Sequence, residues 1–196
     1  MRLIVGMTGA TGALLGIRLL EHLKRNPEVE THLVLSRWAR TTIEMETGMS
    51  VAAVGKLADV VHGPEDQGAT IASGSFRTDG MVIVPCSMKT LAGIRTGYAE
   101  GLVCRAADVV LKERRKLVLV PRETPLSEIH LENMLRLSRA GARIIPAMPA
   151  FYHQPESIDD LVNFVIGKIL DQMDIANDLF KRWDGMRAAR EIQTVA

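Results

Sequence analysis

The feature that most constrains this chain is a short buried strand that leads directly into a glycine-rich turn and then a helix. It occupies Arg2–Leu20, RLIVGMTGATGALLGIRLL, with an apolar run at Leu3–Val5 and helical apolar spacing over Leu14–Leu20. The glycines allow the turn's backbone to approach a ligand that a Cβ would keep away. Free N–H groups and a positive helix end at such a turn are typical of phosphate binding. The alternative is a purely structural turn, because glycine spacing alone is a weak signal.

The turn departs from the dinucleotide-binding fingerprint. Its spacing is Gly6-x-x-Gly9-x-x-Gly12 rather than G-x-G-x-x-G. The second predicted strand, Thr31–Leu35, ends in Ser36-Arg37, where that fingerprint expects a carboxylate for the ribose. NAD is therefore disfavoured, and a mononucleotide such as FMN, with its phosphate on the turn, fits better.

The composition describes an ordinary globular protein and excludes several classes. The 196 residues are 47% apolar and 24% charged, which predicts one domain over residues 1–196. A net charge of +1 gives no reason to expect nucleic acid or an anionic membrane as a partner. Cys86 and Cys104 lack zinc or redox spacing, and no histidine has metal-ligand spacing, so we expect no metal. With no signal peptide or membrane segment visible, we expect a cytoplasmic protein.

Strand and helix patterns alternate along the chain, which predicts an α/β fold with a doubly wound, mostly parallel sheet. Residues 50–78 have weak periodicity and are expected to form a long loop with a short strand or two. Residues 174–196 are expected to form a tail that closes the site or an oligomer interface. The further expected strands are Met81–Val84, closed by Pro85, then Lys116–Val120 and Ala142–Pro146; the further expected helices are Trp38–Glu46, Ser87 to Arg95, Leu102–Arg114, one after Ser127 and Ser157–Met173.

The unusual residues gather at the carboxyl ends of the predicted strands. In doubly wound sheets ligands bind beyond these ends, so we expect one shared pocket. The five segments concerned are Thr8–Gly12, Ser36, Pro85–Thr90, Pro121–Pro125 and Pro146–Tyr152.

Two of these segments offer chemistry. The hydroxyls of Ser87 and Thr90, at a helix N-terminus, suit the polar edge of a flavin, although an ordinary serine N-cap is the alternative. Arg122 and Glu123 stand between two prolines, so the guanidinium can grip phosphate and the carboxylate can manage a proton. A surface Arg–Glu pair is the alternative there.

Two further side chains are candidates for phosphate binding. The hydroxyl of Tyr152, in a proline-rich loop, can donate to a phosphate oxygen. Lys168 lies among apolar helix positions, and its alternative is to extend its ammonium into water.

Four stretches resemble the UbiX-type flavin prenyltransferases: GMTGATGALLGIRLL, PCSMKTLAGIRTG, RAADVVLKERRKLVLVPRETPLSEIHLENMLRLSRAGA and PAFYHQPESIDDLVNFV. The resemblance covers nearly the whole chain, and some members were formerly described as hydroxyaryl-acid decarboxylase subunits. It implies a flavodoxin-like or Rossmann-like three-layer sandwich assembled as a dodecamer. It also implies metal-independent transfer of a dimethylallyl group from dimethylallyl monophosphate to N5 and C6 of reduced FMN. The prenylated FMN would serve a UbiD-type decarboxylase.

The resemblance also assigns residues, position by position. Those matching FMN contacts are Gly9, Ala10, Thr11, Ser36, Ser87, Met88, Lys89, Thr90 and Arg122. Those matching prenyl-phosphate contacts are Lys112, Arg122, Tyr152 and Lys168, with Trp183 as a tail aromatic that closes the pocket. Glu46 and Glu123 match acidic residues near the reacting centre, so the implied catalytic set is Glu46, Lys112, Arg122 and Glu123. The chain has Thr11 where the family often has serine, and Lys168 where some members have arginine.

The sequence disfavours two other functions. An FMN-dependent decarboxylase of the cysteine-decarboxylase type is disfavoured, because PCSMKT replaces its PASANT run and Pro146–Tyr152 lacks its asparagine. A non-catalytic flavin-binding subunit of an aromatic-acid decarboxylase is disfavoured because a carrier needs no second phosphate site. The acceptor of the C6 proton stays open between Glu123 and the phosphate itself.

Overall fold

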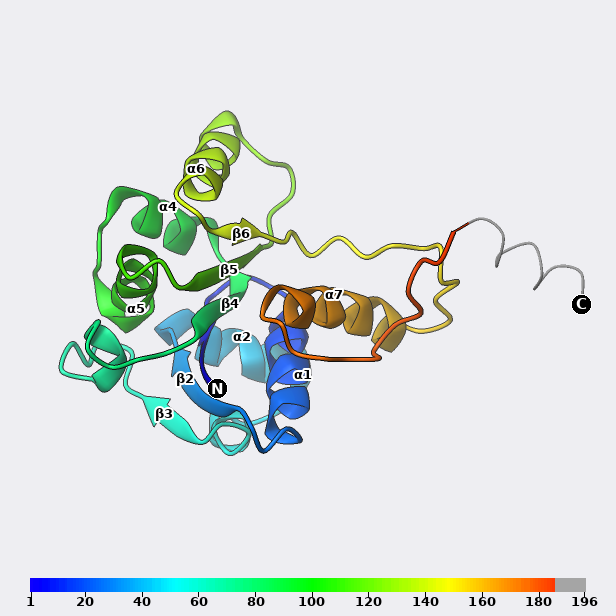
Figure 1. Cartoon of the computed structure of the whole chain (residues 1–196), viewed down its shortest axis with the longest axis horizontal. Coiled ribbons are helices and arrows are strands. Elements are labelled where there is room, and N and C mark those ends of the chain that lie inside the picture. Colours follow the sequence, from blue (N-terminus) through cyan, green and yellow to red (C-terminus); the bar gives the residue numbers. More distant parts are fainter. Residues whose placement is uncertain (186–196) are drawn as a thin grey trace, which may run out of the picture.

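A six-stranded, all-parallel sheet forms the centre of the molecule. The computed structural model describes residues 1–185, and its strands lie in the order β3-β2-β1-β4-β5-β6 (Figure 1). Their bounds are β1 Arg2–Met7, β2 Glu30–Leu35, β3 Val60–His62, β4 Gly80–Cys86, β5 Lys116–Pro121 and β6 Arg143–Ile144. The predicted doubly wound sheet is confirmed.

Helices cover both faces of this sheet and make it the middle layer of three (Figure 1). One face carries α1 (Ala13–Lys24), α2 (Arg37–Thr47), the short α3 (Val51–Gly55) and α7 (Ile158–Gln172). The other carries α4 (Met88–Thr96), α5 (Gly101–Lys112) and α6 (Glu128–Arg139), with the short 3₁₀ helix η1 (Thr70–Ala72) beside α5.

The two cores follow from side-chain alternation along the buried strands. In β1, Leu3, Val5 and Met7 pack toward α1, whereas Ile4 packs toward the opposite helices. Because both faces are covered, the central strands are continuously apolar, and this is why they could be predicted.

Several elements differ from the sequence expectations, among them the strand expected at Ala142–Pro146, which is only the two residues Arg143–Ile144. The segment 50–78 contains a helix, α3, which has only five residues and buries only Val54, too little for a helical period to be visible. The strand expected at Met81–Val84 is not closed by Pro85 but runs from Gly80 through that proline to Cys86. The pairing of β4 with β5 shifts register between Ile83 and Cys86, so the ladder accommodates a proline that has no N–H to donate.

After α7 the chain turns back along that helix. Arg182 donates to both carboxylate oxygens of Asp171, at 2.7 and 2.9 Å, and Phe180 packs against Gly167. Residues 186–196 of the expected tail lie outside the described residues. Within residues 1–185 we find no helix long and apolar enough to cross a membrane.

Candidate active site

The carboxyl ends of β1 and β4 are joined by one buried side chain, Thr8. Its N–H and its hydroxyl both donate to the Pro85 carbonyl, at 3.1 and 2.8 Å, and its Oγ1 accepts the Ser87 N–H at 2.8 Å. The Ser36 N–H donates to the Met7 carbonyl at 3.0 Å, which brings the end of β2 to the same place. The sheet reverses its winding between β1 and β4, so a ligand crevice is expected here.

Two helices begin at this crevice with serine caps. Ser36 Oγ accepts the Ala39 N–H at the start of α2, and Ser87 Oγ accepts the Thr90 N–H at the start of α4. Ser87 also donates to Thr90 Oγ1 at 3.1 Å. The ordinary capping role is therefore present at both positions. The two positive helix ends still begin at these neighbouring strand ends, where they favour an anion.

The start of α1 differs from its sequence expectation. Its first amides, Gly12 N–H and Ala13 N–H, both donate to Glu46 Oε2 at 2.9 Å. The expectation that these N–H groups are free for a phosphate is therefore wrong, because a carboxylate from α2 takes them. The residues concerned are more than thirty positions apart in the chain, so no local pattern could reveal the contact.

The glycine turn is needed for packing against α2. A Cβ on Gly9 would lie 2.3 Å from Trp38 Cβ, and Gly12 has a φ of 99°, which favours glycine. The Trp38 side chain is largely exposed beside the turn. Sequence reasoning missed Trp38 as a candidate wall of the flavin site; its position directly after Ser36-Arg37 was the available signal.

Arg122 and Glu123 follow β5 and line a cavity of about 300 Å³ with Pro146–Met148 and Met134. The Arg122 N–H donates to the Cys86 carbonyl at 3.4 Å, which connects this cavity to the crevice. Glu123 Oε1 accepts the Thr124 N–H at 3.2 Å and, among residues 1–185, forms no ion pair with Arg122. The structure thus does not contain the alternative, a surface ion pair between Arg122 and Glu123. The Arg122 guanidinium remains exposed at the cavity.

A second set of predicted phosphate-site residues lies at and near α7. It consists of Tyr152 and Trp183, with Lys168 on the helix itself. The chain after β6 extends away from the sheet before it enters α7 (Figure 1). The Tyr152 ring lies edge-on to Trp183 at 5.5 Å and to Phe164 at 6.1 Å. Lys168 is one helical turn beyond Phe164, with its Nζ 3.8 Å from Asp171 and its ammonium exposed. Tyr152 and Trp183 are thus brought together, while Lys168 lies on α7, the helix that carries Phe164.

Lys112 stands apart from both groups. It ends α5, four residues before β5 begins, whereas Arg122 directly follows the end of β5. The six residues of β5 span about 20 Å, at about 3.3 Å per residue. Lys112 and Arg122 of the same chain are therefore far apart. The Lys112 ammonium forms an ion pair with the neighbouring Glu113.

The two cysteines and the acidic and histidine residues suggest no other chemistry. Cys86 and Cys104 are free thiols, and burial raises the pKa of both, which makes them poor nucleophiles. In the described part of the chain, no three His, Cys, Asp or Glu side chains are grouped so as to hold a metal ion.

Comparisons with known proteins agree with this geometry. The family model described as "Flavoprotein" matches residues 1–170. A protein of Streptomyces sp. (strain D7), named "Probable UbiX-like flavin prenyltransferase", is 75% identical over 190 residues, covering 97% of this chain and 95% of the relative.

Two solved structures are also similar. The crystal structure of a dodecameric FMN-dependent UbiX-like decarboxylase from Escherichia coli O157:H7 is 65% identical, with a TM-score of 0.93, and covers 94% of this chain and 100% of its own. That of AnUbiX (PadA1) in complex with FMN and dimethylallyl pyrophosphate is 56% identical, with a TM-score of 0.92, and covers 94% and 98%. The chain thus belongs to the flavoprotein family and, within it, to the UbiX-like flavin prenyltransferases.

Proposed function

We propose that this protein transfers a dimethylallyl group from dimethylallyl monophosphate to N5 and C6 of reduced FMN. The observation that carries the proposal is the crevice between β1 and β4, where two helix N-termini point beside the exposed Arg122 and Glu123. The relative AnUbiX, which shares 56% of its sequence with this chain, has been solved with FMN and dimethylallyl pyrophosphate. These helix ends and the exposed Arg122, together with the ligands of this relative, support the binding of a flavin phosphate and of a prenyl phosphate.

In this proposal the FMN site is formed by the glycine turn and the two serine-capped helices. Gly9–Thr11 approach the ligand with their backbone, while Ser36 and the segment Ser87–Thr90 supply hydroxyls and N–H groups. Because Glu46 takes the first amides of α1, the starts of α2 and α4 remain as the anion-binding helix ends. The bound reduced flavin supplies the electron-rich ring that accepts the prenyl group.

Positive side chains stabilise the leaving phosphate. Cleavage of the allylic C–O bond places negative charge on the phosphate, and Arg122 can bind its oxygens in bidentate fashion. Lys112, Lys168 and the Tyr152 hydroxyl complete the phosphate site in this assignment. Glu123, which lies next to Arg122, or the leaving phosphate itself accepts the C6 proton as the new ring closes.

The separation of these groups in one chain leads us to propose that neighbouring copies complete the site. The E. coli O157:H7 relative is a dodecamer, and we propose the same assembly here. Apolar side chains that such an assembly would cover are exposed on α6, at Ile129, Leu131 and Leu135, and on the extended segment, at Met148 and Phe151.

Two cellular assignments belong to the same proposal. The prenylated FMN is delivered to a UbiD-type decarboxylase as its cofactor. The protein acts in the cytoplasm, a setting supported by its two free thiols, since reducing compartments keep cysteines unpaired.

A direct FMN-dependent decarboxylase is the second candidate, because the E. coli O157:H7 relative carries that name. The two functions separate in one anaerobic experiment with reduced FMN and dimethylallyl monophosphate or diphosphate. Prenyl transfer predicts a flavin heavier by one C5 unit and no carbon dioxide from an added hydroxyaryl acid. Unmodified FMN with both prenyl donors would reject it, and release of carbon dioxide would favour the alternative.

A further inference from the structure

The C-terminal end of α5 packs against the loop that contains Gly74. The side chains of Lys112 and Glu113 occupy the space that a side chain at position 74 would take. A Cβ on Gly74 would lie 2.7 Å from Lys112 Nζ and 2.2 Å from Glu113 Oε1. The φ of Gly74 is outside the left-handed region, so the backbone there suits any residue. A side chain at this position would therefore displace the flexible ends of Lys112 and Glu113 rather than strain the backbone.

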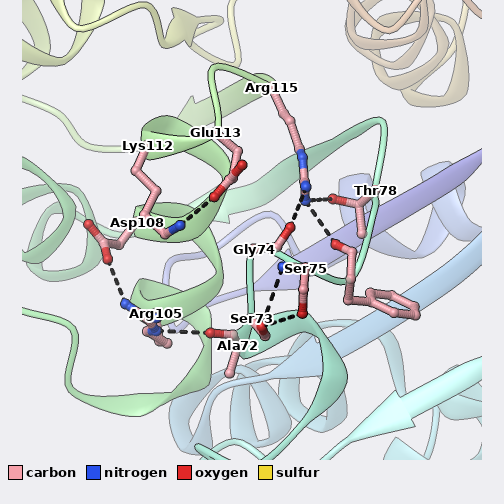
Figure 2. A network of polar contacts seen from close by, with 11 residues as sticks. Ala72, Ser73, Gly74, Ser75, Thr78, Arg105, Asp108, Lys112, Glu113 and Arg115 are labelled. Carbon is pink, nitrogen blue, oxygen red and sulfur yellow. Dashed lines mark hydrogen bonds and ion pairs between the residues drawn. The ribbon is translucent and has the colours of Figure 1, made fainter.

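Two arginines, Arg105 and Arg115, donate hydrogen bonds to this segment, Ala72–Thr78 (Figure 2). Arg115 donates to the Gly74 carbonyl at 2.7 Å, to the Phe76 carbonyl at 2.9 Å and to Thr78 Oγ1 at 3.3 Å. Arg105 donates to the Ala72 carbonyl at 3.1 Å and pairs with Asp108. Hydrogen bonds from a guanidinium are stronger than those between neutral groups, so the Gly74 backbone has a fixed position.

The ends of the Lys112 and Glu113 side chains lie beside this backbone at Gly74 (Figure 2). Their ion pair and hydrogen bond keep the pKa of Glu113 below its usual value. The ammonium is thus paired with Glu113 on one side, and on the other it faces the Gly74 backbone, from which no side chain projects. A lysine held in this way loses less side-chain freedom when it binds an anion.

We propose that Gly74, fixed by Arg115, is a positioning residue for the ammonium of Lys112 in the binding of the prenyl phosphate. This inference rests on the proposed function, in which Lys112 contacts that phosphate. A side chain at position 74 pushes Lys112 and Glu113 aside without disturbing the backbone. It therefore weakens phosphate binding through Lys112 alone and leaves the flavin site, at the other end of the sheet, unchanged.

The test is a double-mutant cycle on the FMN-loaded oligomer. The dissociation constant for dimethylallyl monophosphate is measured by titration calorimetry with oxidised FMN, so that no turnover occurs. Gly74→Ala is expected to raise this constant about tenfold in the wild-type background and to leave it unchanged in a Lys112→Ala background, since contacting sites couple. FMN affinity and the thermal unfolding midpoint are expected to stay at their wild-type values.

Gly63→Ala is the matched control. It is the same substitution in a nearby loop, where the nearest atom to an added Cβ is 3.6 Å away, an ordinary contact. It is expected to leave the dissociation constant unchanged. Arg115→Lys is the second variant: it keeps the charge but loses the fork that reaches three acceptors, and it is expected to weaken the binding of the prenyl phosphate in the same Lys112-dependent way.

The outcomes separate this inference from the function on which it rests. Weakened binding in Lys112→Ala with unchanged binding in Gly74→Ala overturns the inference alone. Equal effects of Gly74→Ala in both backgrounds also overturn it, because they indicate a general structural role. Unchanged binding in Lys112→Ala removes Lys112 from the proposed phosphate site, and this inference with it.

Discussion

At the scale of single residues, the crevice depends on the hydroxyl of Thr8. This side chain is buried, and its hydroxyl both donates to β4 and accepts from the residue that caps α4. Both hydrogen-bonding roles are used, so the residue fixes the distance between the two strand ends. Of the residues assigned to flavin binding, Gly9 directly follows Thr8 in the chain and Ser87 donates its N–H to the Thr8 hydroxyl, so the geometry of both depends on this link.

Thr8→Val is expected to destabilise the protein by about 1–3 kcal/mol, because it keeps the shape but leaves the Ser87 N–H without its partner. Urea unfolding of the apoprotein measures the loss, and FMN affinity should fall with it. Thr8→Ser keeps the hydroxyl and should retain most of both. Equal losses in the two variants would show that the methyl group, and not the hydrogen bonds, matters at this position.

Glu46 has a visible structural role beside the catalytic one assigned by family resemblance. Glu46→Ala is expected to cost about 1 kcal/mol of stability, in the range for losing a helix cap, because two amides of α1 lose their acceptor. Glu46→Gln keeps an oxygen acceptor and should cost less. If the rate of prenyl transfer nevertheless falls equally in both variants, the Glu46 carboxylate acts in the chemistry. If the rate falls only in proportion to the loss of stability, Glu46 serves only as the cap of α1.

At the scale of elements, the regular part of the fold could be predicted and the irregular part could not. The apolar strands β1, β2 and β5 and the capped helices α4 and α7 show clear periods and caps, and the structure has them where expected. The five-residue α3 is too short for a period to be visible, and the strand β4 passes through a proline. The contact of Glu46 with α1 depends on tertiary packing, which local patterns do not contain.

The return of the tail along α7 is an element-scale feature with a pH dependence. The hydrogen bonds from Arg182 hold the pKa of Asp171 below its usual value. The contribution of this pair to stability is thus complete above the ordinary carboxyl pKa of about 3.9 and is lost as the pH falls through the lower folded value.

This dependence can be followed through the fluorescence of Trp183, which packs on Tyr152, in a Trp38→Phe background that removes the other tryptophan. The signal should change as the pH falls through the lowered pKa of Asp171, which is below the ordinary carboxyl value of about 3.9. In Asp171→Asn the interaction of residue 171 with Arg182 is already weakened, so the fluorescence of Trp183 should be nearly independent of pH in this range. A transition of the same size in Asp171→Asn would assign the change to another group.

At the scale of the whole molecule, the predicted phosphate ligands occupy three separate places. Arg122 lies at the carboxyl end of the sheet, Lys112 at the other end, and Tyr152 with Lys168 on the extended segment and α7. The sequence could identify these residues by resemblance, but it could not show that one chain keeps them apart. This separation, with the exposed apolar side chains on α6, supports a site completed between copies.

The most direct measurement is therefore prenyl transfer by mixed oligomers of Lys112→Ala and Arg122→Ala chains. The two chains are co-expressed with different affinity tags, purified through both tags and assayed anaerobically with reduced FMN and dimethylallyl monophosphate. Each variant alone should be nearly inactive, while the mixed oligomer should produce prenylated FMN, detected by mass spectrometry, because some sites combine an intact Lys112 with an intact Arg122 from different chains. Mixed oligomers as inactive as the single variants, beside an active wild-type protein, would contradict a site shared between copies.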